Sequence, residues 1–212
     1  MNFDRIPLSR RNLLKVSALG AVAGGSLSTT ACSSNKPQEI GIVNEDGKRI
    51  LPWSNWSGNQ NCQPNDRIVP RSEDDLLKLL REGNQKIRML GSGHSFSGLV
   101  PTDQTLVSLA RLRGIENVDT ESKQVDVLGG TRLSQLGKEL WDNGLSIINM
   151  SDIDSQTFSG AVATSTHGTG RELQSISGQM LSSRFVTANG DVVNCSPTEN
   201  SDLYYASGNH LA

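Results

Sequence analysis

After its first quarter the chain alternates short apolar blocks with polar, glycine-rich connections. The block 67–69 predicts a strand, and the block 86–90 predicts another. Between them, Ser72 begins a stretch typical of a helix: a serine hydroxyl caps the first turn, three acidic residues follow, and Gly83 ends the stretch. Four leucines form its apolar face: Leu76, Leu77, Leu79 and Leu80. These elements together predict a β-α-β unit.

The remaining pattern predicts further short strands and helices. Strands are expected over 105–109, 124–128 and 145–148, and helices over 131–143, within 157–170 and over 202–206. Asn189-Gly190 stands between Phe185-Val186-Thr187 and Val192-Val193 and predicts a hairpin with a two-residue turn. The fold class is therefore predicted to be α+β.

The first residues follow a different pattern. Ser9-Arg10-Arg11-Asn12-Leu13-Leu14-Lys15 resembles the twin-arginine export signal, and the small-residue stretch 16–31 is too short and too weakly apolar for a spanning helix. We predict that residues 1–31 are a twin-arginine signal peptide and that the polar residues 32–52 are a linker. The export machinery is then a partner, and the protein is expected in the periplasm or anchored on the outer face of the cytoplasmic membrane.

Two outcomes stay open at Cys32. The surrounding residues resemble a lipoprotein cleavage site, which would make Cys32 a lipid anchor, but Thr29 stands where that pattern has leucine. Cleavage by signal peptidase near Ala31 is the alternative. In an oxidising compartment Cys62 and Cys195 could pair, and the sequence leaves that pairing open as well.

Composition removes several classes of protein. The chain has 212 residues, 35 % hydrophobic and 20 % charged, which is typical of a globular protein rather than a membrane-embedded or disordered one. Its net charge of −2 argues against nucleic-acid binding. Three cysteines without close spacing predict neither a disulfide framework nor a metal site.

Two loops carry candidate chemistry. Gly91-Ser92-Gly93-His94-Ser95 follows a predicted strand directly, and its glycines allow consecutive N–H groups to converge on an anion such as a pyrophosphate. It matches neither the dinucleotide fingerprint nor the P-loop. Thr164–Gly170 places hydroxyls and glycines around a second histidine, His167. Each loop alone is more typical of a solvated turn than of a binding site.

Together with Asn55-Trp56-Ser57-Gly58-Asn59, Val69-Pro70-Arg71-Ser72 and the segment 159–170, these loops resemble a known domain. It is the FAD-binding, PCMH-type domain of the vanillyl-alcohol oxidase flavoproteins, and within that family the sugar-lactone oxidases and alditol oxidase. The resemblance covers residues 53–212 and implies a domain of two α+β subdomains. It implies an oxidoreductase that oxidises a sugar, sugar lactone or polyol by hydride transfer to flavin, with oxygen or another acceptor taking the electrons. Together with the predicted signal peptide, this predicts an exported enzyme.

The resemblance also implies roles for single residues. FAD would be attached covalently to His94 through its C8 methyl group. The other residues implied to bind FAD are Gly91, Ser92, Gly93, Ser95, Thr157, Gly160, Ala161, Thr164, His167 and Gly168. For His167 a structural role, hydrogen-bonded to the backbone, is an equal alternative. Trp53 and Trp56 could stack on a ligand, but core packing is the commoner role for such residues.

In the family the FAD domain continues and a second, cap domain supplies the substrate-binding and catalytic residues. We therefore expect this chain to be an N-terminal fragment, truncated before the cap domain and inactive alone, and we assign no catalytic residue. One alternative is a non-catalytic exported protein or lipoprotein that uses a remnant flavin domain as a binding module. Another is a phosphate or nucleotide binder without flavin.

Overall fold

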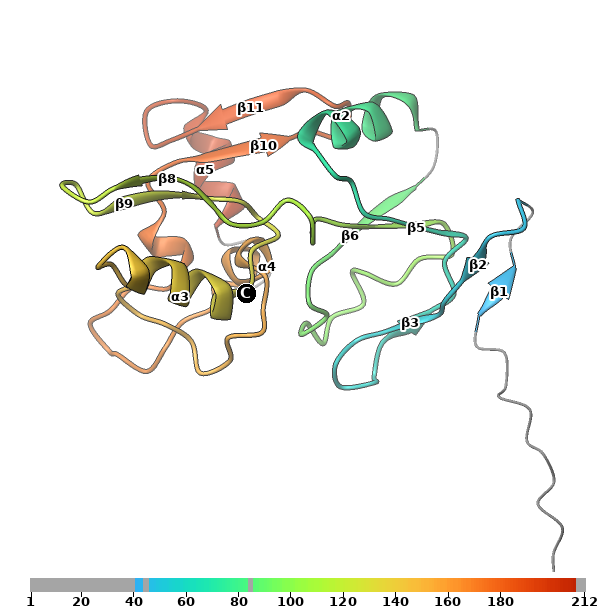
Figure 1. Ribbon diagram of the computed structural model, residues 1–212, viewed down its shortest axis with the longest axis horizontal. Coiled ribbons are helices and arrows are strands. Elements are labelled where there is room, and N and C mark those ends of the chain that lie inside the picture. The colour runs from blue at the N-terminus through green and yellow to red at the C-terminus, as the bar shows by residue number, and fades with distance from the viewer. Residues whose placement is uncertain (1–40, 44–45, 84–85, 209–212) are drawn as a thin grey trace, which may run out of the picture. The chain divides into compact units, whose positions relative to one another are not determined.

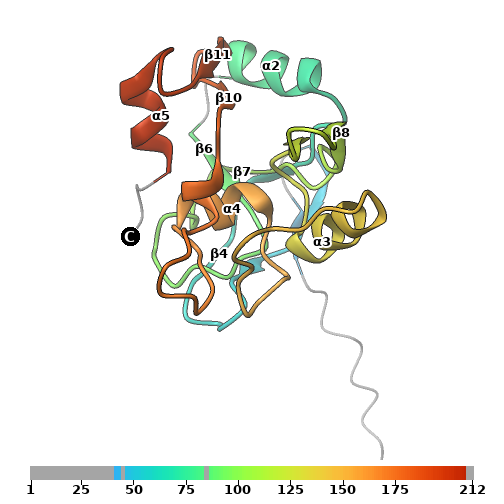
Figure 2. The same cartoon turned by 90° about the vertical axis from the view of Figure 1, so that its left-hand side faces the viewer.

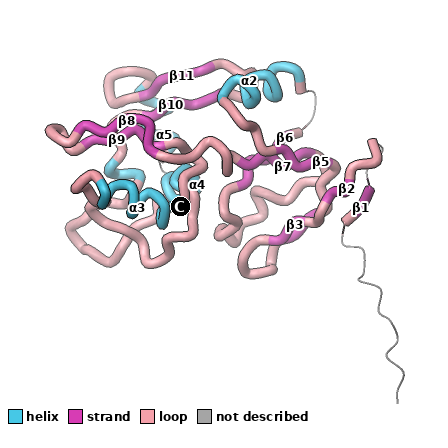
Figure 3. The backbone as a smooth tube through the Cα atoms, viewed as in Figure 1, coloured by secondary structure: helices cyan, strands magenta, loops and turns pink. Residues whose placement is uncertain are grey.

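The computed structural model describes residues 41–43, 46–83 and 86–208, which belong to one unit, Ile40–Ala212. The predicted signal peptide, Cys32 and the first part of the predicted linker lie outside these residues. Figure 1 shows the arrangement of the elements, and Figure 3 shows how much of the chain connects them as loops.

The predicted β-α-β unit is confirmed. It consists of β5 (Asp66–Ile68), α2 (Glu73–Glu82) and β6 (Ile87–Leu90). The Ser72 hydroxyl accepts a hydrogen bond from the Asp75 N–H at 3.1 Å, which is the expected N-cap. A third strand, β7 (Thr105–Ser108), lies between the other two and pairs in parallel with both.

A second group of elements forms the main hydrophobic core. It contains the antiparallel pair β8 (Ile115–Asp119) and β9 (Gln124–Val127), and the helices α3 (Leu133–Asp142) and α4 (Phe158–Ala163). The buried core residues are Leu133, Leu136, Leu140, Ala161, Val162 and Ile176. Three of them recur at helical spacing on α3, which explains why this helix packs here.

The last group is the hairpin β10 (Ser183–Val186) and β11 (Val192–Cys195), preceded by the 3-10 turn η1 (Ser177–Gln179) and followed by α5 (Ser201–Ser207). Helix α2 lies alongside this hairpin in both views (Figures 1 and 2). Arg184 forms a bidentate ion pair with Glu73, and Arg81 donates from Nε to the carbonyl of Gly190 at 3.1 Å. These contacts join elements that are far apart in sequence.

Two local predictions are wrong. Residues 145–148 form a loop rather than a strand, because Leu145 and Ile147 pack against the core cluster as single side chains without strand pairing. The turn of the last hairpin has three residues rather than two. The Thr187 N–H donates to the Asp191 carbonyl at 2.8 Å, so the chain reverses over residues 188–190, with Gly190 at a φ of 78°.

Short antiparallel pairs precede the β-α-β unit. They are β1 (Ile42–Val43) with β2 (Arg49–Ile50), and β3 (Trp53–Ser54) with β4 (Asn61–Cys62). The first pair falls within the range predicted as a linker, and the Ile50 side chain is buried. Among the described helices, none is long and apolar enough to cross a membrane.

Candidate functional site

The loop that carries His94 begins where β6 ends. Gly93 has a φ of 73°, a conformation that glycine adopts without strain. The loop after β3 holds it from one side: the Trp56 N–H donates to the Gly93 carbonyl at 2.8 Å, and the Asn55 side-chain amide donates to the Ser95 carbonyl at 2.9 Å. Asn55 is buried, so these two hydrogen bonds belong to the interior of the fold.

The same loop leaves hydrogen-bond donors uncommitted. The backbone N–H groups of residues 92–95 donate to no other described residue. The Ser92 hydroxyl oxygen is buried and also lacks a partner within the described part of the chain. Buried polar groups are normally paired, and successive free N–H groups form a concave anion site. These residues therefore fit a phosphate-bearing ligand.

The ring of His94 is held by two contacts. The Ser155 Oγ lies 2.6 Å from its Nε2 atom. Trp56 stacks against the ring, with centroids 5.6 Å apart and planes inclined by 23°. The Trp56 side chain is 70 % exposed, whereas that of Trp53 is 7 % exposed. The expected core role is therefore confirmed for Trp53, while Trp56 stacks on a candidate site residue.

The first loop meets the segment before α4. Thr157 is the N-cap of α4, and its hydroxyl accepts from the Gly160 N–H. A Cβ built on Gly91 would lie 2.7 Å from the Thr157 Oγ1 atom. The structure thus brings Gly91, His94, Ser155 and Thr157 together, although more than 60 positions separate the two segments.

The loop after α4 is fixed by its own hydroxyls. The Thr164 Oγ1 donates to the Gly160 carbonyl at 2.9 Å and lies 3.0 Å from the Thr166 Oγ1. Gln156 donates to that same Thr166 oxygen at 3.1 Å. Ala161 is completely buried in the core, and both of its backbone groups are bonded within the protein.

His167 lies on the exposed part of this loop. Its Nδ1 is 2.8 Å from the carbonyl oxygen of Gly168, the backbone partner expected of a structural histidine. Gly168 is pressed against Asn149, where an added Cβ would stand 2.2 Å from Oδ1. Among the described residues, no hydrogen bond or ring contact links His167 to His94.

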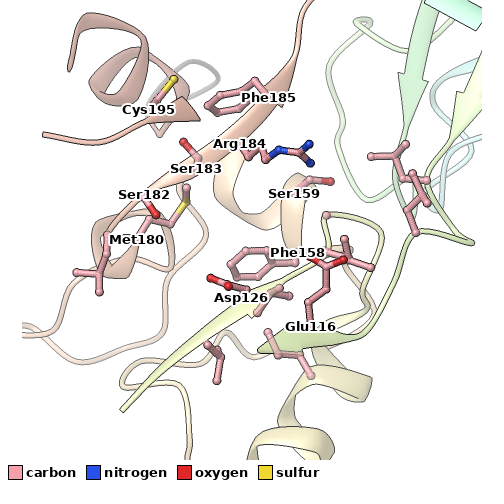
Figure 4. A pocket seen from close by; sticks show the side chains of 18 of the residues that line it. Glu116, Asp126, Phe158, Ser159, Met180, Ser182, Ser183, Arg184, Phe185 and Cys195 are labelled. Atoms are coloured by element: carbon pink, nitrogen blue, oxygen red, sulfur yellow. The ribbon is translucent and has the colours of Figure 1, made fainter. Parts of the chain in front are cut away.

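A cleft of about 1630 Å³ lies beside this site, between the hairpins β8–β9 and β10–β11. Figure 4 shows side chains from both hairpins and from the start of α4 around it, among them Phe158, Phe185, Arg184 and Glu116. None of the residues implied to bind FAD lines this cleft. Phe158, which lines the cleft, follows Thr157 directly in the chain.

Two of the three cysteines lie within the described residues. Cys62 and Cys195 are both free in the structure, the first partly exposed and the second buried. Burial, with a smaller contribution from Glu199, raises the pKa of the Cys195 thiol. No group of three His, Cys, Asp or Glu side chains suited to a metal ion occurs in the part of the chain that is described.

Sequence reasoning did not assign Asn55 or Ser155 to the site. Asn55 belongs to one of the stretches that carry the family resemblance, so its position was a usable signal. Ser155 lies in a polar stretch without any motif, and only the folded contact with His94 identifies it.

Comparison with known proteins gives the following matches. A family model described as an FAD binding domain matches residues 64–196. The chain is 38 % identical over 147 residues to an L-gulono-1,4-lactone dehydrogenase of Mycobacterium tuberculosis, covering 68 % of this chain and 34 % of the relative. It is 30 % identical over 168 residues to an L-gulonolactone oxidase of Bos taurus, covering 78 % of this chain and 38 % of that protein.

Solved structures agree on the fold. A chitooligosaccharide oxidase superposes with a TM-score of 0.64 at 21 % identity, covering 71 % of this chain and 33 % of its own. A 6-hydroxy-D-nicotine oxidase of Arthrobacter nicotinovorans superposes with a TM-score of 0.62 at 24 % identity. The match covers 68 % of this chain and 32 % of that protein. The predicted PCMH-type α+β fold and the resemblance to sugar-lactone oxidases are thereby confirmed. The chain spans about a third of the length of these relatives.

Proposed function

Because the chain belongs to the FAD-binding domain family, we propose that it is the flavin-holding part of an oxidoreductase that acts on the CH–OH group of a sugar lactone or polyol. The relatives named above, lactone dehydrogenases and oxidases, support this substrate class. Oxygen or another electron acceptor would take the electrons from the flavin. Catalytic residues remain unassigned.

The observation that carries the proposal is the meeting of two segments at His94. The free N–H groups of residues 92–95 and the unpaired hydroxyl of Ser92 suit a pyrophosphate, and Thr157 faces the same loop. Trp56 and Ser155 hold the imidazole ring beside these donors. A flavin nucleotide bound here needs hydrogen-bond donors for its pyrophosphate and an oriented histidine beside them, and this site has both.

We further propose that His94 carries FAD covalently. In the net change a bond forms between an imidazole nitrogen and the C8 methyl carbon, one C–H and one N–H bond break, and two protons and two electrons pass to dioxygen, giving hydrogen peroxide. When bound, FAD supplies a ring that accepts hydride from the substrate. The covalent bond keeps the cofactor in place, while the loop donors and Thr157 orient it.

Export by the twin-arginine route to the periplasm or the outer face of the cytoplasmic membrane is also part of the proposal. It is supported by the motif Ser9–Lys15, and Cys32 remains the position for a lipid anchor. Fractionation of cells that carry the unaltered gene, compared with an Arg10→Lys/Arg11→Lys variant, tests this part. Loss of the exported form only in the variant is expected.

The main test is flavin retention by the full chain. We would produce it in bacterial cells, denature it with acid and measure the flavin fluorescence and the intact mass of the protein. A mass increase of one FAD, lost in His94→Ala but kept in the matched variant His210→Ala, is the expected result. A chain without FAD, either bound or attached, would instead favour the non-catalytic binding module.

A further inference from the structure

Ser155 contacts one particular nitrogen of His94. Its Oγ lies 2.6 Å from Nε2, and no described residue forms a hydrogen bond with Nδ1. Trp56 covers a face of the same ring. These contacts fix the plane of the imidazole and leave its Nδ1 edge free.

The backbone on either side gives the Ser155 hydroxyl a fixed place. The carbonyl of Asp154 accepts from the Ser134 N–H at 2.8 Å, and the carbonyl of Gln156 accepts from the Leu133 N–H at 2.9 Å. Leu133 is completely buried, so both bonds tie the segment to the core at the start of α3. A single torsion, χ1, places the oxygen of a serine side chain, so holding that oxygen at His94 costs little conformational entropy.

We propose that Ser155 is a positioning residue that selects Nδ1 of His94 as the nitrogen that bonds to flavin. The inference rests on the proposed function. A neutral imidazole carries a proton on one nitrogen and the lone pair on the other, and the hydrogen bond made by one nitrogen decides which is which. The Ser155 hydroxyl can accept from Nε2–H or donate to Nε2, and we assign the first arrangement, because no described residue offers an acceptor to a proton on Nδ1. In that tautomer the lone pair lies on Nδ1, and that atom is the nucleophile.

The same hydrogen bond gives the Nε2 proton of His94 a path for leaving the ring. When the bond from Nδ1 to the methyl carbon forms, positive charge develops on the ring, and the proton on Nε2 must leave. In the proposed tautomer the Ser155 oxygen accepts that proton and releases its own to water, since the residue is only half-buried. The hydroxyl thus sets the tautomer before the step and removes a proton after it.

Substitutions at Ser155 separate attachment from binding. In Ser155→Ala we expect FAD to be bound as before but attached about tenfold more slowly, the size of effect that loss of one hydrogen bond to a charged group produces. Ser155→Thr keeps a hydroxyl and should recover a rate within about threefold of the unaltered chain. The matched control is Ser151→Ala, since the Ser151 hydroxyl in the same loop donates to the Ile153 carbonyl and not to His94.

Nuclear magnetic resonance gives a second readout that requires no flavin. The ¹⁵N shifts of His94 at alkaline pH should show the Nε2–H tautomer in the unaltered chain and in Ser151→Ala, and a mixture of tautomers in Ser155→Ala. A role limited to folding would leave the tautomer unchanged.

Peptide mapping of the attached flavin completes the test. A bond at Nδ1, together with slow attachment in Ser155→Ala, supports the inference. A bond at Nε2, or equal rates in the unaltered chain and Ser155→Ala, overturns the inference but leaves the proposed function standing. Absence of covalent flavin from the unaltered chain overturns both.

Discussion

Gly91 lies directly against Thr157: a Cβ at Gly91 would stand 2.7 Å from the Thr157 Oγ1 atom. That oxygen also caps α4, so moving it aside costs the bond from the Gly160 N–H. The contact is therefore the point at which the His94 loop and the α4 segment fit together.

We predict that Gly91→Ala raises the dissociation constant for FAD about tenfold or more. The alanine methyl must displace the Thr157 hydroxyl and so open the site. Titration with FAD, followed by flavin fluorescence, measures this change in a His94→Ala background, where no flavin can be attached covalently. Gly98→Ala is the matched control in the same loop region, since its Cβ would meet only the Gln60 side chain, at 3.4 Å. Equal FAD retention by the two variants would show that the contact does not shape the site.

The sequence predicted the local elements better than their assembly. Ser72, the four leucines and Gly83 define α2 through nearest-neighbour chemistry, so its bounds followed from pattern alone. The strand β8 was not predicted, because four of its five residues are exposed and no apolar alternation marks it. The failed strand at 145–148 had the opposite cause, since its apolar residues pack against a core without pairing.

The site shows the same division. The glycines around His94 are a local signal, whereas Thr157 was predicted as a site residue only through the resemblance to the flavoprotein family. Ser155 reaches His94 only because hydrogen bonds to α3 place its segment there, and no pattern within one segment encodes such a contact.

Gly130 should tolerate no side chain. A Cβ there would lie 1.8 Å from the Leu109 carbonyl oxygen and 2.7 Å from that of Leu112, and both are backbone atoms that cannot rotate away. We expect Gly130→Ala to lower the free energy of unfolding by about 3 kcal/mol or more. Gly137→Ala is the control: within α3 nothing lies within 4 Å of its Cβ, so the helix should gain about 0.5–1 kcal/mol. Denaturant unfolding of both variants measures the difference, and a loss of stability in Gly137→Ala would contradict the packing described for α3.

The ion pair between Arg184 and Glu73 joins α2 to β10 near the surface, with side chains that remain partly exposed. Glu73 raises the pKa of Arg184, chiefly through their hydrogen bonds. Because solvent screens such a pair, we expect a coupling energy below about 1 kcal/mol in a double-mutant cycle of Arg184→Gln and Glu73→Gln. The coupling should fall further as salt is raised from 0.05 to about 1 M. A larger, salt-independent value would mean that the pair is shielded from water.

The Cys195 thiol should react slowly with alkylating reagents, and its ionisation should affect the free energy of unfolding at alkaline pH. Its side chain is 2 % exposed, and burial first, Glu199 second, raises the pKa of its thiol. Peptide-resolved alkylation with iodoacetamide should modify the partly exposed Cys62 first and reach Cys195 only as the chain unfolds. Similar rates at both thiols would contradict the burial of Cys195 at the end of β11.

The pH dependence follows from the direction of that pKa change. Since the thiol pKa is higher in the folded chain, its contribution to stability is complete below the ordinary value of about 8.5 and is lost as the pH rises through the folded value. In that interval only the unfolded chain gains by ionising. As the pH rises above about 8.5, the free energy of unfolding should therefore fall more steeply in the unaltered chain than in Cys195→Ala, whatever the absolute stability of the variant. Cys62→Ala controls for loss of a thiol elsewhere and should keep the steeper slope, and parallel slopes for all three proteins would show that Cys195 ionises equally in both states.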